Sequence, residues 1–326
     1  MSFSVIITGA NGSLALPTVS HLLNAKPNLV LILTVRNATE ADVNTQRLRH
    51  IISRFPKAKV SIHEVDLANL ASVHQFASHV VDGIRNGVYP ALSAIICTAY
   101  YWDLVGDHKS TITGDGYDKT FQVNLIAHAA LVLRLLGSFH PDGGRILTFT
   151  SDAHWPGKNL FEKIPPAIPG NLNELVNPQP LDDRAGDDFH RYANSKLAIV
   201  MWTYALNRHL QKAAMAMNPG NLVDSRALRT NTPSKMANLQ RFLFQPFKSV
   251  LRLADATMRT AANAAADVVE LATSPALDRG GFYNLLSKTE SAPDSYNEEV
   301  QDTLWTRTLN WAGINEQNIG LGALFH

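Results

Sequence analysis

Short apolar runs alternate with amphipathic stretches along this chain of 326 residues, and few architectures accommodate that alternation. Strands and helices in turn are typical of βαβ units around a parallel sheet with helices on both faces. The sequence therefore predicts one α/β domain over residues 1–326, built on a doubly wound parallel sheet of about seven strands. The predicted strands are residues 5–8, 30–35, 60–65, 92–98, 145–150, 215–217 and 281–286. The clearest predicted helices are residues 117–137, 192–210 and 261–273.

Two segments interrupt the alternation. Residues 155–190 are rich in Pro, Gly, Asn and Asp and are too long for an ordinary connection, so they are either functional or decorative. Residues 221–255 carry several Phe and Leu residues and have apolar helical character. Because strand and helix signals resume after each segment, we interpret both as insertions rather than domain linkers.

Composition excludes several classes of function. The net charge of +1 argues against a strong electrostatic footprint for nucleic acid or an anionic membrane. A single cysteine, Cys97, allows no internal disulfide and no Cys-rich metal site, and we expect no metal. No run reaches the ~18–20 apolar residues of a membrane span, and no secretory signal is recognisable, which predicts a cytoplasmic protein without a membrane span.

The first predicted strand leads into a glycine-containing turn, Thr8-Gly9-Ala10-Asn11-Gly12-Ser13-Leu14-Ala15. Glycines there let backbone amides approach a phosphate, and the following helix adds a favourable dipole. A glycine turn alone is weak evidence, but the first βα turn is where a Rossmann-type sheet holds a dinucleotide. The predicted cofactor-binding residues in this turn are Thr8, Gly9, Asn11, Gly12, Ser13 and Leu14.

Arg36 follows the second strand, where an acidic residue would accept the ribose hydroxyls of NAD and a basic one accommodates the 2′-phosphate of NADP. Arg36 therefore predicts NADP(H), the alternative being a solvated residue at a strand end.

Tyr192 and Lys196 lie four apart and project from one face of a helix. A nearby ammonium favours tyrosinate, which exchanges a proton with a carbonyl or alcohol.

In this order along the chain, the motifs resemble those of the short-chain dehydrogenase/reductase family over most of its length. The motifs are the turn at 8–15, Asp66-Leu67, Phe121-Gln122-Val123-Asn124, Thr150-Ser151, Tyr192-Ala193-Asn194-Ser195-Lys196 and Asn218-Pro219-Gly220. The chain is most similar to the retinol-dehydrogenase-like branch and related carbonyl reductases. Four segments indicate that branch: Asp115-Gly116-Tyr117, Ser151-Asp152-Ala153-His154, Tyr192 to Ala198, and Gly281-Phe282-Tyr283 with Leu304-Trp305.

The resemblance implies a role for each catalytic residue. Tyr192 would be the general acid in reduction or the base in oxidation, and Ser151 would hydrogen-bond the substrate oxygen. Lys196 would lower the pKa of Tyr192 and hold the nicotinamide ribose, while Asn124 would support Lys196 through an ordered water. The implied cofactor contacts beyond the turn are Asp66, Leu67, Thr98, Ala99, Lys196, Pro219, Gly220 and Leu222.

The chain departs from the family pattern in two places. Ser13 and Ala15 stand where the family turn has glycines, and Tyr100 ends the segment Cys97-Thr98-Ala99-Tyr100, where the family has Asn-Asn-Ala-Gly. These departures keep two alternatives open. One is a cofactor-binding protein without redox turnover, such as a regulator or a non-redox cyclase or rearrangement catalyst. The other, from the Gly9/Gly12 spacing, is an epimerase or dehydratase.

We interpret both insertions as lying on the substrate side of the sheet. Tyr100, Tyr101, Trp102 and Trp155 are predicted to line the substrate site, with Leu160, Phe161 and Leu181 as further apolar lining from a lid over 155–190. Such a site predicts a ketoreductase of secondary metabolism that acts on a bulky apolar molecule, such as a polycyclic ketone, polyketide, terpenoid or steroid. The family resemblance also allows a homodimer or homotetramer through the helix that bears Tyr192.

Overall fold

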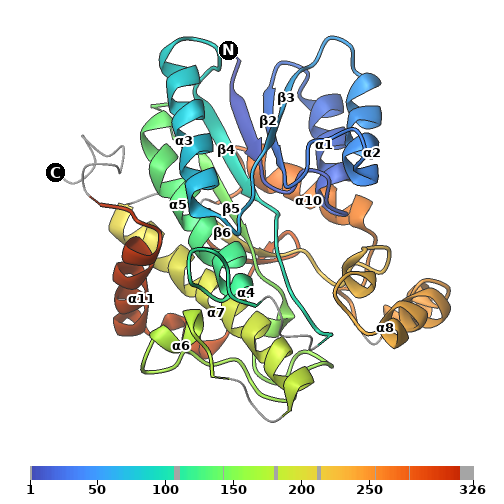
Figure 1. Ribbon diagram of the computed structural model, residues 1–326. Helices are drawn as coiled ribbons and strands as arrows, with labels where there is room; N and C mark the ends of the chain where they lie inside the picture. The colour runs from blue at the N-terminus through green and yellow to red at the C-terminus, as the bar shows by residue number, and fades with distance from the viewer. Residues whose placement is uncertain are drawn as a thin grey trace.

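A computed structural model describes residues 2–105, 111–141, 143–179, 183–210, 214–253, 255–278 and 280–315. Its centre is one eight-stranded sheet with the order β3-β2-β1-β4-β5-β6-β7-β8, shown in Figure 1. Strands β1 to β7 are parallel, and β8 pairs antiparallel with β7. The strands are β1 Ser4–Ile7, β2 Val30–Val35, β3 Lys59–Glu64, β4 Leu92–Cys97, β5 Arg145–Phe149, β6 Ala214–Asn218, β7 Gly281–Asn284 and β8 Ser287–Lys288.

All seven predicted strands are present. The sheet has one more strand than the predicted number of about seven, namely β8. The last predicted strand, 281–286, stops at Asn284 because Leu285 adopts a positive φ of 60° and reverses the chain. The two residues of β8 then pair back, Ser287 opposite Asn284. A two-residue strand has no apolar alternation that a sequence could reveal.

The central strands are apolar on both faces because helices cover both sides of the sheet. Alternate residues of each strand enter two cores: Ile6 and Ile32 join one, while Val5 and Leu31 join the other. In Figure 1 the first core lies under α3 Leu70–Arg85, α5 Ala127–Leu135, α7 Arg184–Leu210 and α11 Glu298–Trp311. The second lies under α1 Ala15–Ala25, α2 Val43–Ser53 and α10 Ala261–Thr273.

The predicted helix 117–137 is confirmed, but it is not regular. It consists of α4 Lys119–Phe121, a π-helical turn Gln122–Ile126, α5 and a 3₁₀ turn Leu136–Ser138. The run Lys119–Ser138 is long and apolar enough by composition to cross a membrane, but 89% of its apolar window is buried inside the protein. It is a core helix of this fold, packed against α3.

Helix α7 begins at Arg184, eight residues before the predicted start at Tyr192. The sequence before Tyr192 is polar, and the structure pairs its charges instead of exposing them. Arg191 binds Asp187 at 2.7 Å and also lies 3.4 Å from Asp118 of the neighbouring helix. Burial raises the pKa of Asp118 to about 6, although the hydrogen bond from Phe121 and the Arg191 charge act against that rise. Tyr192 therefore lies inside a long helix and not at its first turn.

The predicted helical insertion at 221–255 is confirmed as a series of short turns. They are a 3₁₀ turn Ala227–Arg229, α8 Ser234–Leu239, a π-helical turn Gln240–Phe244 and α9 Lys248–Leu251. In Figure 1 the part around α8 projects away from the sheet. The remaining short elements are the 3₁₀ turns Asp152–His154 and Pro293–Tyr296 and the helix α6 Asn173–Val176.

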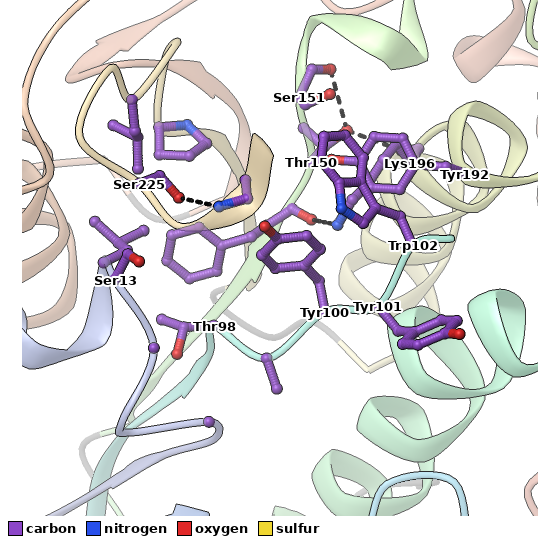
Figure 2. Close-up of a pocket in the computed structure, with 18 of the residues that line it drawn as sticks. Ser13, Thr98, Tyr100, Tyr101, Trp102, Thr150, Ser151, Tyr192, Lys196 and Ser225 are labelled. Atoms are coloured by element: carbon purple, nitrogen blue, oxygen red, sulfur yellow. Dashed lines mark hydrogen bonds between the residues drawn. The ribbon is translucent and has the colours of Figure 1, made fainter. Parts of the chain in front are cut away.

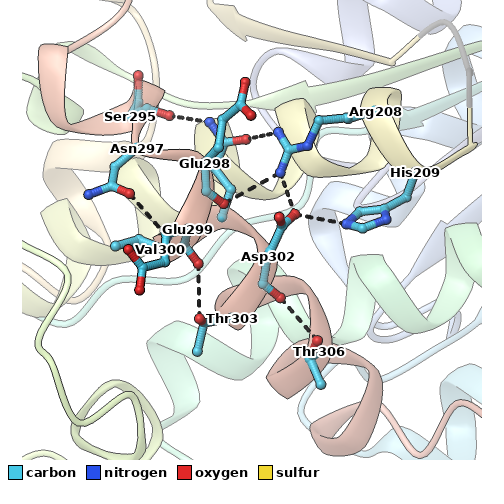
Figure 3. A network of polar contacts seen from close by, with 11 residues as sticks. Arg208, His209, Ser295, Asn297, Glu298, Glu299, Val300, Asp302, Thr303 and Thr306 are labelled. Carbon is cyan, nitrogen blue, oxygen red and sulfur yellow. Dashed lines mark hydrogen bonds and ion pairs between the residues drawn. The ribbon is translucent and has the colours of Figure 1, made fainter.

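The C-terminal helix α11 is fastened to the end of α7. Arg208 donates to Gln301 and to Asp302, and His209 lies 2.9 Å from the same Asp302 carboxylate (Figure 3). Trp202 of α7 stacks on Trp305 with ring centroids 6.2 Å apart. These contacts hold α7 in place from the end opposite to Tyr192.

Candidate active site

A cavity of about 1580 Å³ lies at the carboxyl ends of the parallel strands, where open α/β sheets bind their ligands. The structure brings nearly all predicted site residues to its wall. Those on the wall are Gly9, Asn11, Gly12, Ser13, Leu14, Arg36, Asp66, Leu67, Thr98, Ala99, Tyr100, Tyr101, Trp102, Ser151, Trp155, Tyr192, Lys196, Pro219, Gly220 and Leu222. Thr8 and Asn124 are buried just behind it.

Two positions of the cavity wall require glycine. Gly9 has a φ of +60°, and a Cβ there would lie 2.9 Å from the Cβ of Ala99. Gly220 has a φ of +84°, and its Cβ would lie 2.4 Å from the carbonyl oxygen of Thr257.

Helix α1 starts beside the cavity with no side-chain cap at Leu14 and no acidic residue in its first turn. Pro17 has no N–H, and the amides of Leu16 and Thr18 already donate to backbone carbonyls, so within the described residues the Ala15 amide is the donor of this first turn that is left for an anion. That amide and the glycine turn before it fit a dinucleotide phosphate.

Hydrogen bonds behind the wall hold the turn in shape. Thr8 Oγ1 accepts from the Ala99 amide at 3.2 Å and lies 2.9 Å from His128 Nε2, while Thr98 Oγ1 donates to the Thr8 carbonyl. Asn11 Nδ2 donates to Thr45 Oγ1 at 2.9 Å. Predicted binding residues such as Thr8 therefore fix the shape of the turn from behind.

The ends of β2 and β3 form the adjacent part of the wall. Arg36 is exposed directly after β2, and Asp66 accepts a hydrogen bond from the Ala68 amide at 3.0 Å. Both side chains border the cavity next to the turn, as expected for residues at an adenosine site.

Tyr192, Ser151 and Lys196 lie together at the other end of the cavity (Figure 2). The Tyr192 phenol lies near the Ser151 hydroxyl, and the Tyr192 side chain is almost fully buried. The Nζ atom of Lys196 donates to the Phe149 carbonyl at 2.8 Å and lies 5.4 Å from the Tyr192 ring centroid. A hydrogen bond of 2.9 Å from Thr150 Oγ1 to the Lys196 carbonyl fastens α7 to the end of β5.

Burial sets the acid–base character of this end. It raises the pKa of Tyr192, with a further rise from Tyr100 and a smaller opposing effect of the Ser151 hydrogen bond. Burial also lowers the pKa of Lys196 to about 7. The expectation that Lys196 lowers the pKa of Tyr192 stays a prediction. Desolvation of the phenol is the larger effect, and the buried amine itself loses its proton near neutral pH.

Asn124 lies in the π-helical turn, and its carboxamide is fully engaged. It exchanges hydrogen bonds with the backbone of Tyr101, at 2.7 Å to the amide and 3.0 Å to the carbonyl, and donates to Ser195 Oγ at 2.9 Å. Its own carbonyl lies 3.2 Å from His128 Nδ1. Asn124 thus joins the segment after β4 to α7, and its role toward Lys196 through water stays a prediction.

Aromatic rings surround Tyr192. Those of Tyr100, Trp102 and Phe189 lie 6.4, 5.2 and 6.0 Å from the Tyr192 ring, centroid to centroid. Figure 2 shows the Tyr100 ring between the Ser13 end and the Tyr192 end, and the Tyr101 ring turned away from both.

The residues of the predicted lid over 155–190 differ in how far they are buried at the cavity wall. Trp155, Leu160 and Phe161 all border the cavity, but Leu160 is 94% exposed. Leu181 lies outside the described residues.

Sequence reasoning missed two residues of the site. Arg226 donates hydrogen bonds to the glycine turn, and His128 connects that turn to Asn124. For Arg226 the sequence did contain a signal. Residues 225–254 include six basic residues and no acidic one, and such an excess of positive charge favours the binding of an anion. The six are Arg226, Arg229, Lys235, Arg241, Lys248 and Arg252. His128 lies in an apolar helix and gave no such signal.

Comparisons with known proteins agree with this geometry. A family model described as the AcuH dehydrogenase domain matches residues 226–321. The dehydrogenase acuH of Aspergillus aculeatus is 39% identical over 27% of this chain and 90% of its own length. The short-chain dehydrogenase iccH of Talaromyces variabilis is 27% identical over 96% of both chains. Retinol dehydrogenase 13 of Mus musculus is 26% identical over 95% of this chain and 84% of its own length. This chain belongs to the short-chain dehydrogenase/reductase family.

Solved structures show the same fold. A short-chain dehydrogenase/reductase from Serratia marcescens matches with a TM-score of 0.59 and 17% identity, over 86% of this chain and 95% of its own. A short-chain dehydrogenase from Burkholderia cenocepacia in complex with NADP matches with a TM-score of 0.57 and 18% identity, over 87% and 96%. The family resemblance inferred from the motifs is confirmed, and the chain is an oxidoreductase of the short-chain dehydrogenase/reductase type.

Proposed function

We propose that the chain uses NADPH to reduce a carbonyl group on a bulky, largely apolar small molecule, or oxidises the corresponding alcohol in reverse. The observation that carries the proposal is the closeness of the Tyr192 and Ser151 hydroxyls to each other and to the Lys196 amine, at the aromatic end of the cavity. Two hydroxyl groups together suit the recognition of one substrate oxygen. Few other reactions need a buried phenol and a buried amine side by side.

The mechanism assigns one task to each side chain. The cofactor, when bound, supplies the hydride. Tyr192 gives its phenolic proton to the substrate oxygen in reduction and takes it back in oxidation. Ser151 donates a hydrogen bond to the same oxygen as negative charge develops on it. Lys196 carries a positive charge below its pKa of about 7, which favours loss of the proton from Tyr192.

The substrate class follows from what surrounds Tyr192. Trp102, Phe189 and Tyr100 form aromatic walls, and Trp155 also borders the cavity. Apolar rings beside one polar corner favour a molecule that is apolar except at the reacting carbonyl. The cavity of about 1580 Å³ exceeds the ~300–1,000 Å³ of ordinary ligand sites, which leaves room for a dinucleotide and a large substrate together.

Two observations support NADPH over NADH. Arg36 follows β2 at the position that meets a 2′-phosphate, and the solved relative from Burkholderia cenocepacia is described in complex with NADP. The proposal also includes a cytoplasmic location and a homodimer or homotetramer through α7. Light scattering on the purified protein measures that assembly.

The test combines binding with turnover. NADPH and NADH are titrated into the purified protein, and the absorbance of reduced nicotinamide is followed with a panel of cyclic ketones. We expect tighter binding of NADPH and turnover that Tyr192→Phe abolishes. Binding of NADPH without turnover of any ketone, unchanged in Tyr192→Phe, would favour the alternative of a cofactor-binding protein without redox activity. That alternative has one observation in its favour, the Tyr100 ring 5.6 Å from Lys196 Nζ.

A further inference from the structure

Arg226 lies eight residues after β6, yet its hydrogen bonds go to the glycine turn near the other end of the chain. Its Nη2 donates to the Asn11 carbonyl at 2.5 Å, and its Nε donates to Ser13 Oγ at 3.2 Å. Its backbone amide donates to the same Ser13 oxygen at 3.0 Å. Because both the main chain and the side chain are held, the fold itself places this guanidinium on the turn.

The charge of Arg226 has no carboxylate partner there. Within the described residues it forms no ion pair, and its Nη1 makes no hydrogen bond. The side chain is half-buried, and its pKa is lowered by burial and by the nearby charge of Arg47. Asp42 offsets part of that charge, but its carboxylate already accepts from the Thr45 amide at 2.7 Å. An anion between the two guanidinium groups would stabilise both.

The surroundings of Arg226 suit a phosphate. The Ala15 amide at the start of α1 makes no hydrogen bond within the described residues, and Asn11, Ser13 and Arg226 all line the cavity at this place. We infer that Arg226 binds the pyrophosphate of the dinucleotide cofactor, adding a guanidinium to the amide donors at the start of α1. The inference rests on the proposed function only in requiring that a dinucleotide binds. It also gives Ser13 a role, because a glycine there would offer Arg226 no hydroxyl.

Arg226 and Arg36 recognise different phosphates. Arg36 follows β2, where the 2′-phosphate of NADP is expected, whereas Arg226 contacts the middle of the turn, where a pyrophosphate lies. The pyrophosphate is common to NADPH and NADH. Arg226 therefore contributes to the affinity for both cofactors, and Arg36 to the preference between them.

The experiment measures dissociation constants for NADPH, NADH and ADP-ribose by titration, without a substrate. In R226Q we expect all three to rise by the same factor, about tenfold for a lost charged hydrogen bond. In R36Q we expect only the constant for NADPH to rise. R241Q removes an exposed arginine of the same insertion and should leave all three unchanged.

Salt separates a phosphate contact from a merely structural role. Wild-type affinity for ADP-ribose should fall more steeply between 0.05 and about 0.5 M NaCl than that of R226Q, because screening weakens only the charge that is present. R226K, which keeps the cation, should retain the steep dependence; it is also the variant to use if R226Q does not fold.

Two results would overturn the inference alone: unchanged ADP-ribose binding in R226Q, or a salt dependence equal in wild type and both variants. Failure of the wild-type protein to bind any of the three ligands would instead overturn the proposed function together with it.

Discussion

The two ends of the cavity are built in different ways. At the phosphate end, around Gly9 and the start of α1, a glycine with positive φ and backbone amides set the shape, and the charged side chains stand at the rim. At the catalytic end, two titratable side chains, Tyr192 and Lys196, are almost fully buried among aromatic rings. The shape of the phosphate end thus depends on backbone geometry, whereas the acid–base properties of the catalytic end depend on the desolvation of its titratable groups. Substitutions at the first should change affinity for the cofactor, and those at the second should change the rate of chemistry.

The largest effect is expected from Tyr192→Phe, which keeps the ring and removes the proton. We expect kcat to fall about 10³-fold, within the range for loss of a general acid, while NADPH affinity changes less than about twofold. Initial rates of NADPH oxidation with a responsive ketone, and a separate NADPH titration, measure the two quantities.

Tyr204→Phe is the control for that change. Tyr204 is on the same helix, but its hydroxyl bonds Ser291 and does not line the cavity. A large loss of NADPH affinity in Tyr192→Phe would contradict the separation of the two ends.

His128 joins the two ends, and its titration is the next largest effect. Its Nδ1–H donates to the Asn124 carbonyl, so its Nε2 accepts from the Thr8 hydroxyl, which requires the neutral ring. Burial, more than the nearby Lys196 charge, lowers its pKa from 6.5 to about 4. The unfolded chain therefore binds a proton below pH 6.5 that the folded chain does not accept until about pH 4. The stability due to the neutral ring is complete above pH 6.5 and is lost as the pH falls toward 4, by about 3 kcal/mol.

The measurement is urea unfolding of wild type and His128→Asn at pH 7, 5.5 and 4.5. His154 is also shifted to about 4, and Asp118, raised to about 6, changes stability in the opposite direction, so the difference between variant and wild type is the informative quantity. We expect that difference to shrink at low pH. His50→Asn, on the exposed face of α2, is the matched control. A difference constant over this range would contradict the assignment.

Gly9→Ala tests the phosphate end. A Cβ at a φ of +60° and 2.9 Å from the Ala99 Cβ forces the turn to move, at a cost of about 1–2 kcal/mol. We expect NADPH to bind about 10- to 30-fold more weakly, with kcat at saturating NADPH changed less than about threefold.

Gly87→Ala is a close control for that change, because Gly87 has a φ of +73° but nothing within 4 Å of an added Cβ. It carries the backbone strain without the collision and lies outside the cavity wall. Equal losses of NADPH affinity in the two variants would show that the turn plays no special part.

How much the sequence revealed differs between these ends. The glycine turn, Asp66 and the pair Tyr192 and Lys196 are each local patterns, because a turn or one helical repeat brings their members together. The contact of Arg226 with Ser13 joins segments 213 residues apart, and no local pattern records such a pairing. The early start of α7 escaped prediction for a related reason, since Asp118 of another helix takes part in neutralising its polar first turns.

The direction of the Tyr192 pKa was also beyond the sequence. The four-residue spacing correctly places an amine beside the phenol, but it carries no information about burial. Burial depends on Phe189 of the same helix and on Tyr100 and Trp102, which come from the distant segment after β4. The spacing of the two residues therefore identified the pair but could not show that both groups are removed from solvent.

Tyr100 lies between the two ends, and the smallest predicted effect decides to which end it belongs. Its ring contacts those of Trp102 and Tyr192, with centroids 6.2 and 6.4 Å apart. If it belongs to the substrate wall, Tyr100→Ala should raise KM for a polycyclic ketone about fivefold, as an aromatic contact is worth about 1 kcal/mol. NADPH affinity should stay within about twofold, and Tyr100→Phe, which keeps the ring, should resemble wild type in both. An unchanged KM with altered NADPH affinity would place Tyr100 at the phosphate end, where the family has a glycine. The aromatic walls would then belong partly to the cofactor, and the space left for substrate would be larger than proposed.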